Sequence, residues 1–360
     1  MDDNLIRRAR KMSSANHLYD VEQDVERAIH HSQVNPDQLR NKTIFITGGT
    51  GFFGTWFLSV LVSIKRSLGG ALKIYALSRA PEKFAETAPG KDLDRDVIFL
   101  KGDICNFDFT SYNDITHVVH MATTSAKETY LGEDSINKLD MLYRGTSNLL
   151  EKCPSKFESV LFTSSGVAYG LIEDGDRISE TDQGVFDPLD RNAALGLGKL
   201  VAESLVSLYA SKRKFNFSIA RCFSFAGQYL PMDLHYAFGN FVANALAEEV
   251  ISIKGDGLDR RSYLYIGDAV AWLLRLLVEP KNGIFNVGSE NGLEVRELAE
   301  RIDKQLSKPL GTKVQNSDVG VGNFRRLEYI PSTEKIRTAY PGLKEWTALD
   351  EIIGKMLVVK

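Results

Sequence analysis

Cysteine is scarce in this chain, and long uncharged hydrophobic runs are absent. Its three cysteines, Cys105, Cys153 and Cys222, are too few and too scattered for a disulfide framework or a zinc cluster. No segment reaches about 18 apolar residues without a charge, and the most apolar window, residues 52–64, is too short to span a bilayer. The charged N-terminal segment lacks the apolar core of a signal peptide. We therefore expect a cytoplasmic protein without a membrane anchor.

Neither sign of charge dominates. Lys and Arg number 44 against 47 Asp and Glu, which gives a formal net charge of −3. This balance provides no general field for attracting nucleic acid or an anionic membrane. The 43% hydrophobic and 25% charged fractions exclude collagen-like, coiled-coil and wholly disordered chains. His117, His120 and His235 have no metal-ligand spacing, so no metal site is expected.

Strand-like and helix-like segments alternate from Lys42 to about residue 225. The strand-like runs are 42–47, 71–78, 97–103, 116–122, 159–165 and 217–223. Such alternation predicts an α/β fold with a doubly wound parallel Rossmann sheet. We expect a helical extension over 1–40, the dinucleotide-binding domain over 41–225 and a smaller C-terminal α+β substrate lobe over 226–360. Residues 283–289 again read as a buried strand and are expected to return to the sheet.

A glycine-rich loop follows the first predicted strand and opens an apolar helix. Its glycines, Gly48, Gly51 and Gly54, have the spacing G-x-x-G-x-x-G. One glycine allows the tight turn, another lets a pyrophosphate approach the backbone, and the third lets helix and sheet pack closely. The helix start at Phe52 and Phe53 supplies free N–H groups and partial positive charge for phosphates. The loop therefore predicts a bound dinucleotide.

The end of the second predicted strand bears on which dinucleotide binds. Ser78 and Arg79 stand where an acidic residue would grip the ribose of NAD. An arginine there can pair with the extra phosphate of NADP, so the cofactor is NAD or NADP, with NADP favoured. Alternatively, Arg79 lies over the adenine. Asp103 is either an adenine contact or a loop cap, and we add Ile104 and Ala122 to the predicted cofactor-binding residues.

Several motifs together resemble the extended short-chain dehydrogenase/reductase family over residues 42–355. The matching segments are ITGGTGFFG (46–54), KGD (101–103), VVHMA (118–122), LFTSSGVAYG (161–170), GLGKLVAE (196–203), IARCFSFAG (219–227), GDGLDRRSYLYIGDAV (255–270) and FNVGSE (285–290). This family includes nucleotide-sugar epimerases, dehydratases and decarboxylases. The resemblance implies a nucleotide-sugar substrate and a homodimer formed through long helices beginning near Gly145 and Gly198. It does not select one reaction.

The resemblance also implies a hydride cycle with one position altered. In the family, a Tyr whose pKa is lowered by a Lys four residues later removes a proton from a sugar hydroxyl, and a Ser or Thr polarises the same oxygen. Lys199 matches the Lys and Ser165 matches the Ser, but Leu195 stands at the Tyr position and cannot transfer a proton. Three interpretations stay open. The chain is a catalytically silent binding paralogue, an engineered inactive variant, or an enzyme with another base, such as a substrate-bound water, Lys127 or a side chain of the C-terminal lobe.

Other positions bear on the reaction and the substrate. Gly166 and Val167 stand where family dehydratases carry acidic residues, which counts against 4,6-dehydration and, less strongly, against decarboxylation. Epimerisation and ketone reduction need no second acid–base pair there. Arg261 matches the family arginine that pairs with the diphosphate, for which its planar fork is suited, although a surface salt bridge is the alternative. Asn240 resembles a diphosphate or base contact, and Thr124 follows the fourth predicted strand, at the edge where ligands bind.

Overall fold

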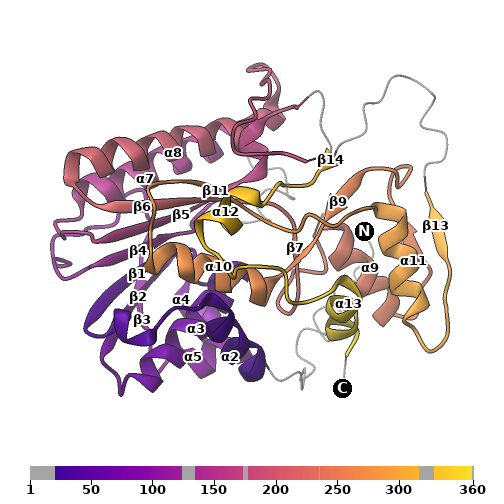
Figure 1. Cartoon of the computed structure of the whole chain (residues 1–360), viewed down its shortest axis with the longest axis horizontal. Helices are drawn as coiled ribbons and strands as arrows, with labels where there is room; N and C mark the ends of the chain where they lie inside the picture. The colour runs from indigo at the N-terminus through magenta and orange to yellow at the C-terminus, as the bar shows by residue number, and fades with distance from the viewer. Residues whose placement is uncertain (1–20, 124–133, 173–176, 235, 316–327, 359–360) are drawn as a thin grey trace.

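A computed structural model of the chain describes residues 21–123, 134–172, 177–234, 236–315 and 328–358. A large parallel sheet with helices on both faces forms one lobe, and a smaller lobe of short strands and helices lies beside it (Figure 1). The doubly wound fold with a smaller C-terminal lobe, predicted from the sequence, is confirmed.

The sheet has seven strands in the order β11-β6-β5-β4-β1-β2-β3, and every neighbouring pair is parallel. The strands are β1 (Lys42–Thr47), β2 (Leu72–Ser78), β3 (Ile98–Lys101), β4 (His117–His120), β5 (Ser159–Ser165), β6 (Asn216–Cys222) and β11 (Gly283–Val287). The central strands are buried on both faces, which explains their continuous apolar runs. The strand order reverses between β1 and β4, so a ligand crevice is expected at the carboxyl ends of these two strands.

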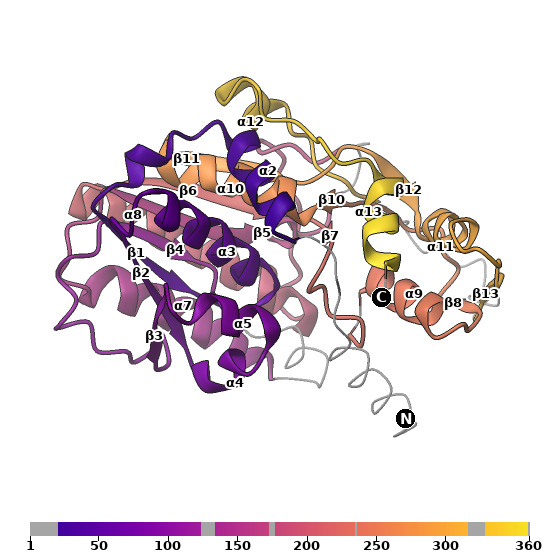
Figure 2. The same ribbon diagram turned by 90° about the horizontal axis from the view of Figure 1, so that it is seen from below.

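Helices cover both faces of the sheet. Helices α7 (Ser135–Lys152) and α8 (Ala194–Arg213) lie on one face, and α3 (Phe52–Ser67) and α10 (Ile266–Val278) on the other (Figures 1 and 2). Two short helices, α4 (Pro81–Ala85) and α5 (Ala88–Leu93), lie between β2 and β3 in the chain. Gly145 lies in the middle of α7, and α8 begins four residues before Gly198.

The smaller lobe consists of short elements. Its helices are α9 (Ala237–Leu246), α11 (Val295–Lys304) and α13 (Leu349–Leu357), whereas α12 (Glu334–Ala339) packs on the edge strand β11 of the large sheet. Its strands pair as β7 (Phe225–Ala226) with β10 (Leu264–Tyr265), β8 (Ile251–Ile253) with β13 (Thr312–Val314), and β9 (Arg260–Ser262) with both β12 (Gly292–Glu294) and β14 (Glu328–Tyr329). Three 3-10 helices, η1 (Pro36–Leu39), η2 (Gly166–Tyr169) and η3 (Arg191–Ala193), complete the described elements.

The helix α2 (Val21–Ser32) packs on α3 and α10 as an outer layer (Figure 2). Asp24 of α2 is buried and lies 3.2 Å from the ammonium nitrogen of Lys355 on α13. Tyr265 donates a short hydrogen bond to the same carboxylate. Helix α2, which belongs to the predicted N-terminal extension, is therefore bound to the C-terminal half of the chain by an ion pair and a hydrogen bond.

One helix among the described residues, Arg191–Arg213, has the length and apolar composition to cross a membrane. It contains α8, which packs on α7 and on strands β5 and β6. The apolar residues on the side of α8 that faces α7, β5 and β6 are therefore explained by packing in the core.

Candidate cofactor and catalytic site

The glycine loop is held tightly against the neighbouring strand. Gly48 has φ of +73°, a left-handed conformation that favours glycine. A Cβ at Gly48 would lie 2.8 Å from the carbonyl carbon of Met121 and 2.9 Å from the nitrogen of Ala122. A Cβ at Gly54 would lie 2.2 Å from the carbonyl oxygen of Gly48. These two glycines are therefore required by the packing of the loop itself.

Gly51 is different, because nothing in the described protein requires glycine there. Its φ of −87° suits any residue, and an added Cβ would meet only the Gly48 carbonyl oxygen at 3.5 Å, an ordinary contact. Within the described chain, no side chain caps the first turn of α3, which begins at Phe52. The position thus combines open space with a helix N-terminus, and both fit the pyrophosphate of a dinucleotide.

The residues predicted to hold the adenosine end lie at the carboxyl ends of β2 and β3 or directly after them. Ser78 Oγ lies 3.4 Å from Thr50 Oγ1 and accepts a hydrogen bond from the Ala80 N–H, while Arg79 is exposed. Asp103 Oδ1 accepts a hydrogen bond from the Cys105 N–H at 2.9 Å, as expected of a loop cap. Its adenine contact stays a prediction.

Ile104 and Ala122, also predicted to bind the cofactor, both make contacts with other residues of the protein. Ile104 is buried and packs where Gly145 of α7 leaves room for it. The Ala122 N–H donates a hydrogen bond to Thr47 Oγ1 at 3.1 Å. Ala122 therefore lies two residues beyond the end of β4, directly beside the glycine loop.

A buried histidine, His120, links the strands and helix beneath the candidate site by hydrogen bonds. His120 Nδ1 lies 2.7 Å from Thr47 Oγ1 on β1, and Nε2 lies 3.0 Å from Thr146 Oγ1 on α7. Burial lowers the pKa of His120 to about 3, so the ring is neutral at physiological pH. His120 is therefore a structural connection between β1, β4 and α7.

Of the two adjacent serines at the end of β5, only Ser165 is available to a substrate. Ser164 donates a hydrogen bond to Glu203, whose carboxylate also accepts two bonds from Arg221, at 2.9 and 2.7 Å. Since successive strand residues face opposite ways, Ser165 points away from this buried pair. Its Oγ lies 3.5 Å from the hydroxyl oxygen of Tyr329 on β14.

Lys199 lies on α8 beneath the carboxyl end of β5. Its ammonium group is buried, donates a hydrogen bond to the Thr163 carbonyl oxygen at 2.7 Å and lies 4.9 Å from the ring centre of Phe162. Burial lowers the pKa of Lys199 to about 8, because it disfavours the charged form. Leu195 lies one helical turn earlier and is half-buried. The predicted lysine position is thus intact, whereas the residue one turn before it offers no proton.

Two of the predicted substrate residues, Arg261 and Asn240, lie in the smaller lobe. Arg261 on β9 is half-buried, and its guanidinium carbon lies 5.7 Å from the ring centre of Tyr329. Asn240 lies on α9 and is half-buried. Thr124 and Lys127 lie outside the described residues. The structure therefore brings Ser165 and Arg261 together around Tyr329.

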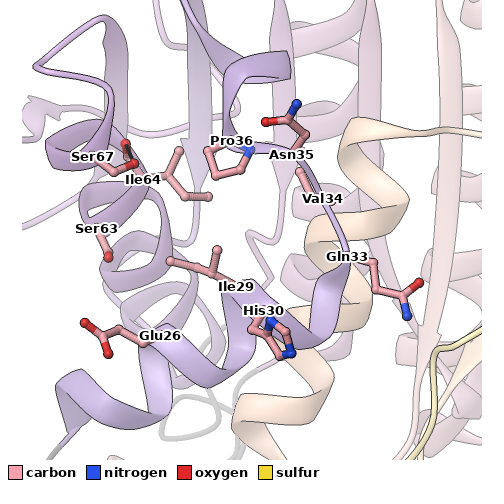
Figure 3. Close-up of a pocket in the computed structure, with 10 residues that line it drawn as sticks. All are labelled: Glu26, Ile29, His30, Gln33, Val34, Asn35, Pro36, Ser63, Ile64 and Ser67. Atoms are coloured by element: carbon pink, nitrogen blue, oxygen red, sulfur yellow. Dashed lines mark hydrogen bonds between the residues drawn. The ribbon is translucent and has the colours of Figure 1, made fainter.

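An open hollow of about 620 Å³ lies elsewhere, between α2 and α3, and none of the predicted site residues lines it (Figure 3). Glu26 and His30 of α2 and Ser63 of α3 are on its walls. Across the described ranges, no group of three or more His, Cys, Asp or Glu side chains is placed to hold a metal ion. The candidate site is thus defined by the loop and strand ends rather than by the size of a cavity.

Comparison with known proteins identifies the family. Residues 44–288 match the model of the NAD dependent epimerase/dehydratase family. The chain belongs to this family. The predicted resemblance to nucleotide-sugar epimerases, dehydratases and decarboxylases of the extended short-chain type is thereby confirmed, and these relatives are enzymes.

Individual relatives of this chain are named for different reactions. UDP-glucuronic acid decarboxylase 6 of Arabidopsis thaliana is 26% identical over 285 residues, which cover 76% of this chain and 79% of that protein. The structure of Thermus thermophilus UDP-glucose 4-epimerase with NAD is 23% identical, with a TM-score of 0.69 over 88% of this chain and 97% of that one. The dTDP-glucose 4,6-dehydratase of Streptomyces venezuelae, with NAD bound, is 20% identical, with a TM-score of 0.69 over 87% and 95%.

Sequence reasoning missed Tyr329. The tyrosine lies 164 residues from Ser165 along the chain, and no motif connects the two. The one local sign was Gly166, where a Cβ would lie 2.6 Å from the Tyr329 hydroxyl oxygen. A glycine directly after the candidate serine thus indicates that another group approaches this position.

Proposed function

We propose that this chain modifies a nucleotide sugar by transient oxidation at a sugar hydroxyl, with NAD or NADP as the bound oxidant. The observation that carries the proposal is the open position at Gly51, on a helix N-terminus at the same sheet edge as Ser165 and Lys199. The cofactor bound in the structures of relatives is NAD. Epimerisation or ketone reduction is favoured, because Gly166 and Val167 provide no acid–base pair for dehydration.

Each side chain has a separate task in this proposal. A bound nicotinamide supplies the chemistry of hydride transfer. Ser165 Oγ donates a hydrogen bond to the reacting sugar oxygen and so stabilises developing negative charge there. The Lys199 ammonium places positive charge beneath the same strand end, and Arg261 pairs with the diphosphate. These groups bind and polarise, and the proton on the sugar hydroxyl still needs an acceptor.

A catalytically silent binding protein is the second candidate, and Leu195 is the observation that favours it. Leu142 supports it too, since it stands at the position of a family asparagine. Its side chain is buried and packs where Gly198 of α8 leaves room. Such a protein, whether a paralogue or an inactivated variant, would bind cofactor and nucleotide sugar without turnover.

Anaerobic single-turnover mixing tests the two candidates. Purified protein is mixed with NAD⁺ or NADP⁺ and with UDP-, dTDP-, GDP- and CDP-sugars, while the reduced-nicotinamide absorbance band is followed and products are analysed by mass spectrometry. Reduced cofactor or an altered sugar would support the enzyme, and loss of CO₂ would mark decarboxylation. Binding by calorimetry without either signal would support the silent protein.

We also propose a cytoplasmic location and a preference for NADP. The first is supported by three free thiols, at Cys105, Cys153 and Cys222, as is usual in a reducing compartment. The second is supported by the exposed Arg79 at the end of β2.

A further inference from the structure

We propose that the hydroxyl of Tyr329 exchanges the proton with the sugar hydroxyl, in place of the group missing at Leu195. The inference rests on the proposed function. It concerns a residue of the smaller lobe that enters the catalytic site at the end of β14, whereas Leu195 belongs to helix α8 of the sheet lobe.

The spacing of two hydroxyl groups carries the inference. Tyr329 Oη and Ser165 Oγ lie 3.5 Å apart. Two oxygens at this separation can each reach a third oxygen at about 2.7–2.8 Å, the usual O–H···O distance. One sugar hydroxyl can therefore contact both, with Ser165 as its polarising group and Tyr329 as its proton partner.

The fold makes a specific place for the Tyr329 ring. A Cβ at Gly166 would lie 2.6 Å from the Tyr329 hydroxyl oxygen and 2.8 Å from the ring carbon that bears it, so only glycine leaves the ring in position. The ring of Phe223 packs against it with ring centres 4.7 Å apart. Tyr329 also pairs with Arg261 in the β14–β9 register. Backbone pairing and ring packing therefore fix the Tyr329 ring, and the absence of a side chain at Gly166 leaves room for its hydroxyl beside Ser165.

Some groups around the Tyr329 hydroxyl raise its pKa and others lower it. Burial raises the pKa of Tyr329 to about 12, and the nearby thiol of Cys222 acts in the same direction. The Ser165 hydroxyl, the Arg261 guanidinium and the Gly166 N–H lower the pKa, because each stabilises the phenolate. A positively charged nicotinamide nearby would favour the phenolate further. The group is thus a phenol in the free chain, and its ionisation responds to what binds beside it.

The proton balance closes without another residue. Binding of the positively charged cofactor favours loss of the Tyr329 proton to solvent. Oxidation then moves a hydride from the sugar carbon to the nicotinamide and a proton from its hydroxyl oxygen to the Tyr329 phenolate, which leaves a ketone and a neutral phenol. Reduction from either face of the ketone returns the hydride to carbon and the phenol proton to oxygen. Tyr329 ends as it began, which suits epimerisation at a site where Gly166 and Val167 cannot move protons.

Two variants test the inference by turnover. Tyr329→Phe removes only the hydroxyl and should lower the single-turnover rate by roughly 10²–10⁴, the range for one acid–base group, while the Kd values for NAD⁺ and the sugar nucleotide change less than about threefold. Tyr209→Phe on α8 is the matched control and should retain the rate. The double variant Leu195→Tyr/Tyr329→Phe should regain activity. Wild-type turnover that survives Tyr329→Phe would overturn the inference and leave the proposed function standing.

A spectroscopic measurement tests the inference without turnover. With 3-fluorotyrosine installed at position 329, the ¹⁹F resonance is titrated with pH in the free protein, with NAD⁺, and with NAD⁺ plus UDP-glucose. We expect the apparent pKa to fall when NAD⁺ binds. Binding that leaves the titration unmoved would overturn the inference alone. Failure of both NAD⁺ and NADP⁺ to bind in calorimetry would overturn the proposed function, and the inference with it.

Discussion

Two glycines of one loop are expected to respond differently to the same substitution. Gly51→Ala adds a methyl group in ordinary contact with the protein, so the free energy of unfolding should change by less than about 1 kcal/mol. The methyl would occupy the proposed pyrophosphate position, so affinity for NAD⁺ and NADP⁺ should fall at least roughly tenfold, about 1.4 kcal/mol. Calorimetry with each cofactor measures the affinity.

Gly54→Ala is the matched comparison for Gly51→Ala. Its methyl group would lie 2.2 Å from a backbone oxygen, so the loop and helix must shift. Overpacking of this kind costs about 1–3 kcal/mol, which urea unfolding would detect. Full cofactor affinity in Gly51→Ala would contradict the assignment of the loop as the cofactor site.

Arg79 decides between the two dinucleotides in a separate test. If its guanidinium pairs with the extra phosphate of NADP, Arg79→Ala should weaken NADP⁺ binding roughly tenfold or more, because hydrogen bonds to charged groups contribute about 1.5–3 kcal/mol. Binding of NAD⁺ should change little. Equal effects on both cofactors would instead support the placement of Arg79 over the adenine.

The sequence predicted side chains close to motifs better than those brought in from a distance. Ser165 and Lys199 each lie in a recognisable segment, and the structure places both at the end of β5. Tyr329 comes from another lobe, and its approach depends on the pairing of β14 with β9. Contacts of this kind follow from tertiary packing, and local periodicity contains no information about them.

At the scale of elements, the contact between α2, α10 and the segment before α13 should depend on pH. Asp268 of α10 accepts hydrogen bonds from the N–H groups of Trp346 and Thr347, and His31 of α2 lies 4.0 Å away, stacked on Trp346. Burial raises the pKa of Asp268 to about 6, so the folded chain holds this proton more tightly than the unfolded chain does. The stabilisation is present below pH 4 and is lost as pH rises through 6.

Comparison with Asp268→Asn isolates this effect, since asparagine does not titrate. The difference in unfolding free energy between wild type and variant should fall by about 2 kcal/mol from pH 4.5 to 7.5, measured by urea unfolding. Burial lowers the pKa of His31, so the contribution of His31 to the unfolding free energy rises with pH. Because His31 is present in both wild type and variant, this contribution is reduced when the two unfolding free energies are subtracted. A difference that does not change with pH would show that Asp268 ionises normally.

Among the elements, those governed by burial on both faces were predicted best. β1 covers residues 42–47 and β5 covers 159–165, the bounds expected from their apolar runs. The first turns of α7, near Ile136, Leu139 and Tyr143, carry exposed apolar side chains, so the periodicity of the core alone does not mark where this helix begins. The end of an element at the surface depends on caps such as Asp134.

For the whole molecule, the outer face of α7 and α8 is expected to form a homodimer. Ile136, Tyr143, Val201 and Leu208 are large apolar residues exposed on these two helices, with Leu208 67% exposed. Apolar side chains gathered on one face mark an interaction surface, and a two-fold contact would cover them.

Sedimentation velocity tests this expectation. The wild-type chain should sediment as a dimer, and the double variant Tyr143→Glu/Leu208→Glu as a monomer, because the contact would bury two uncompensated charges on each subunit. Val250→Glu, at an exposed apolar position in the smaller lobe, is the control and should stay dimeric. A monomeric wild-type protein would rule out this assembly.

The last strand of the large sheet has a consequence for how the protein is made. β11 pairs with β6, yet it is synthesised only after much of the smaller lobe, which lies between the two strands in the sequence. Until residues 283–287 emerge, β6 has an open edge of unpaired backbone groups, which is a template for pairing with other chains. Translation that stalls between these two strands would therefore produce a nascent chain prone to aggregate, and this interval is where chaperones would be most needed.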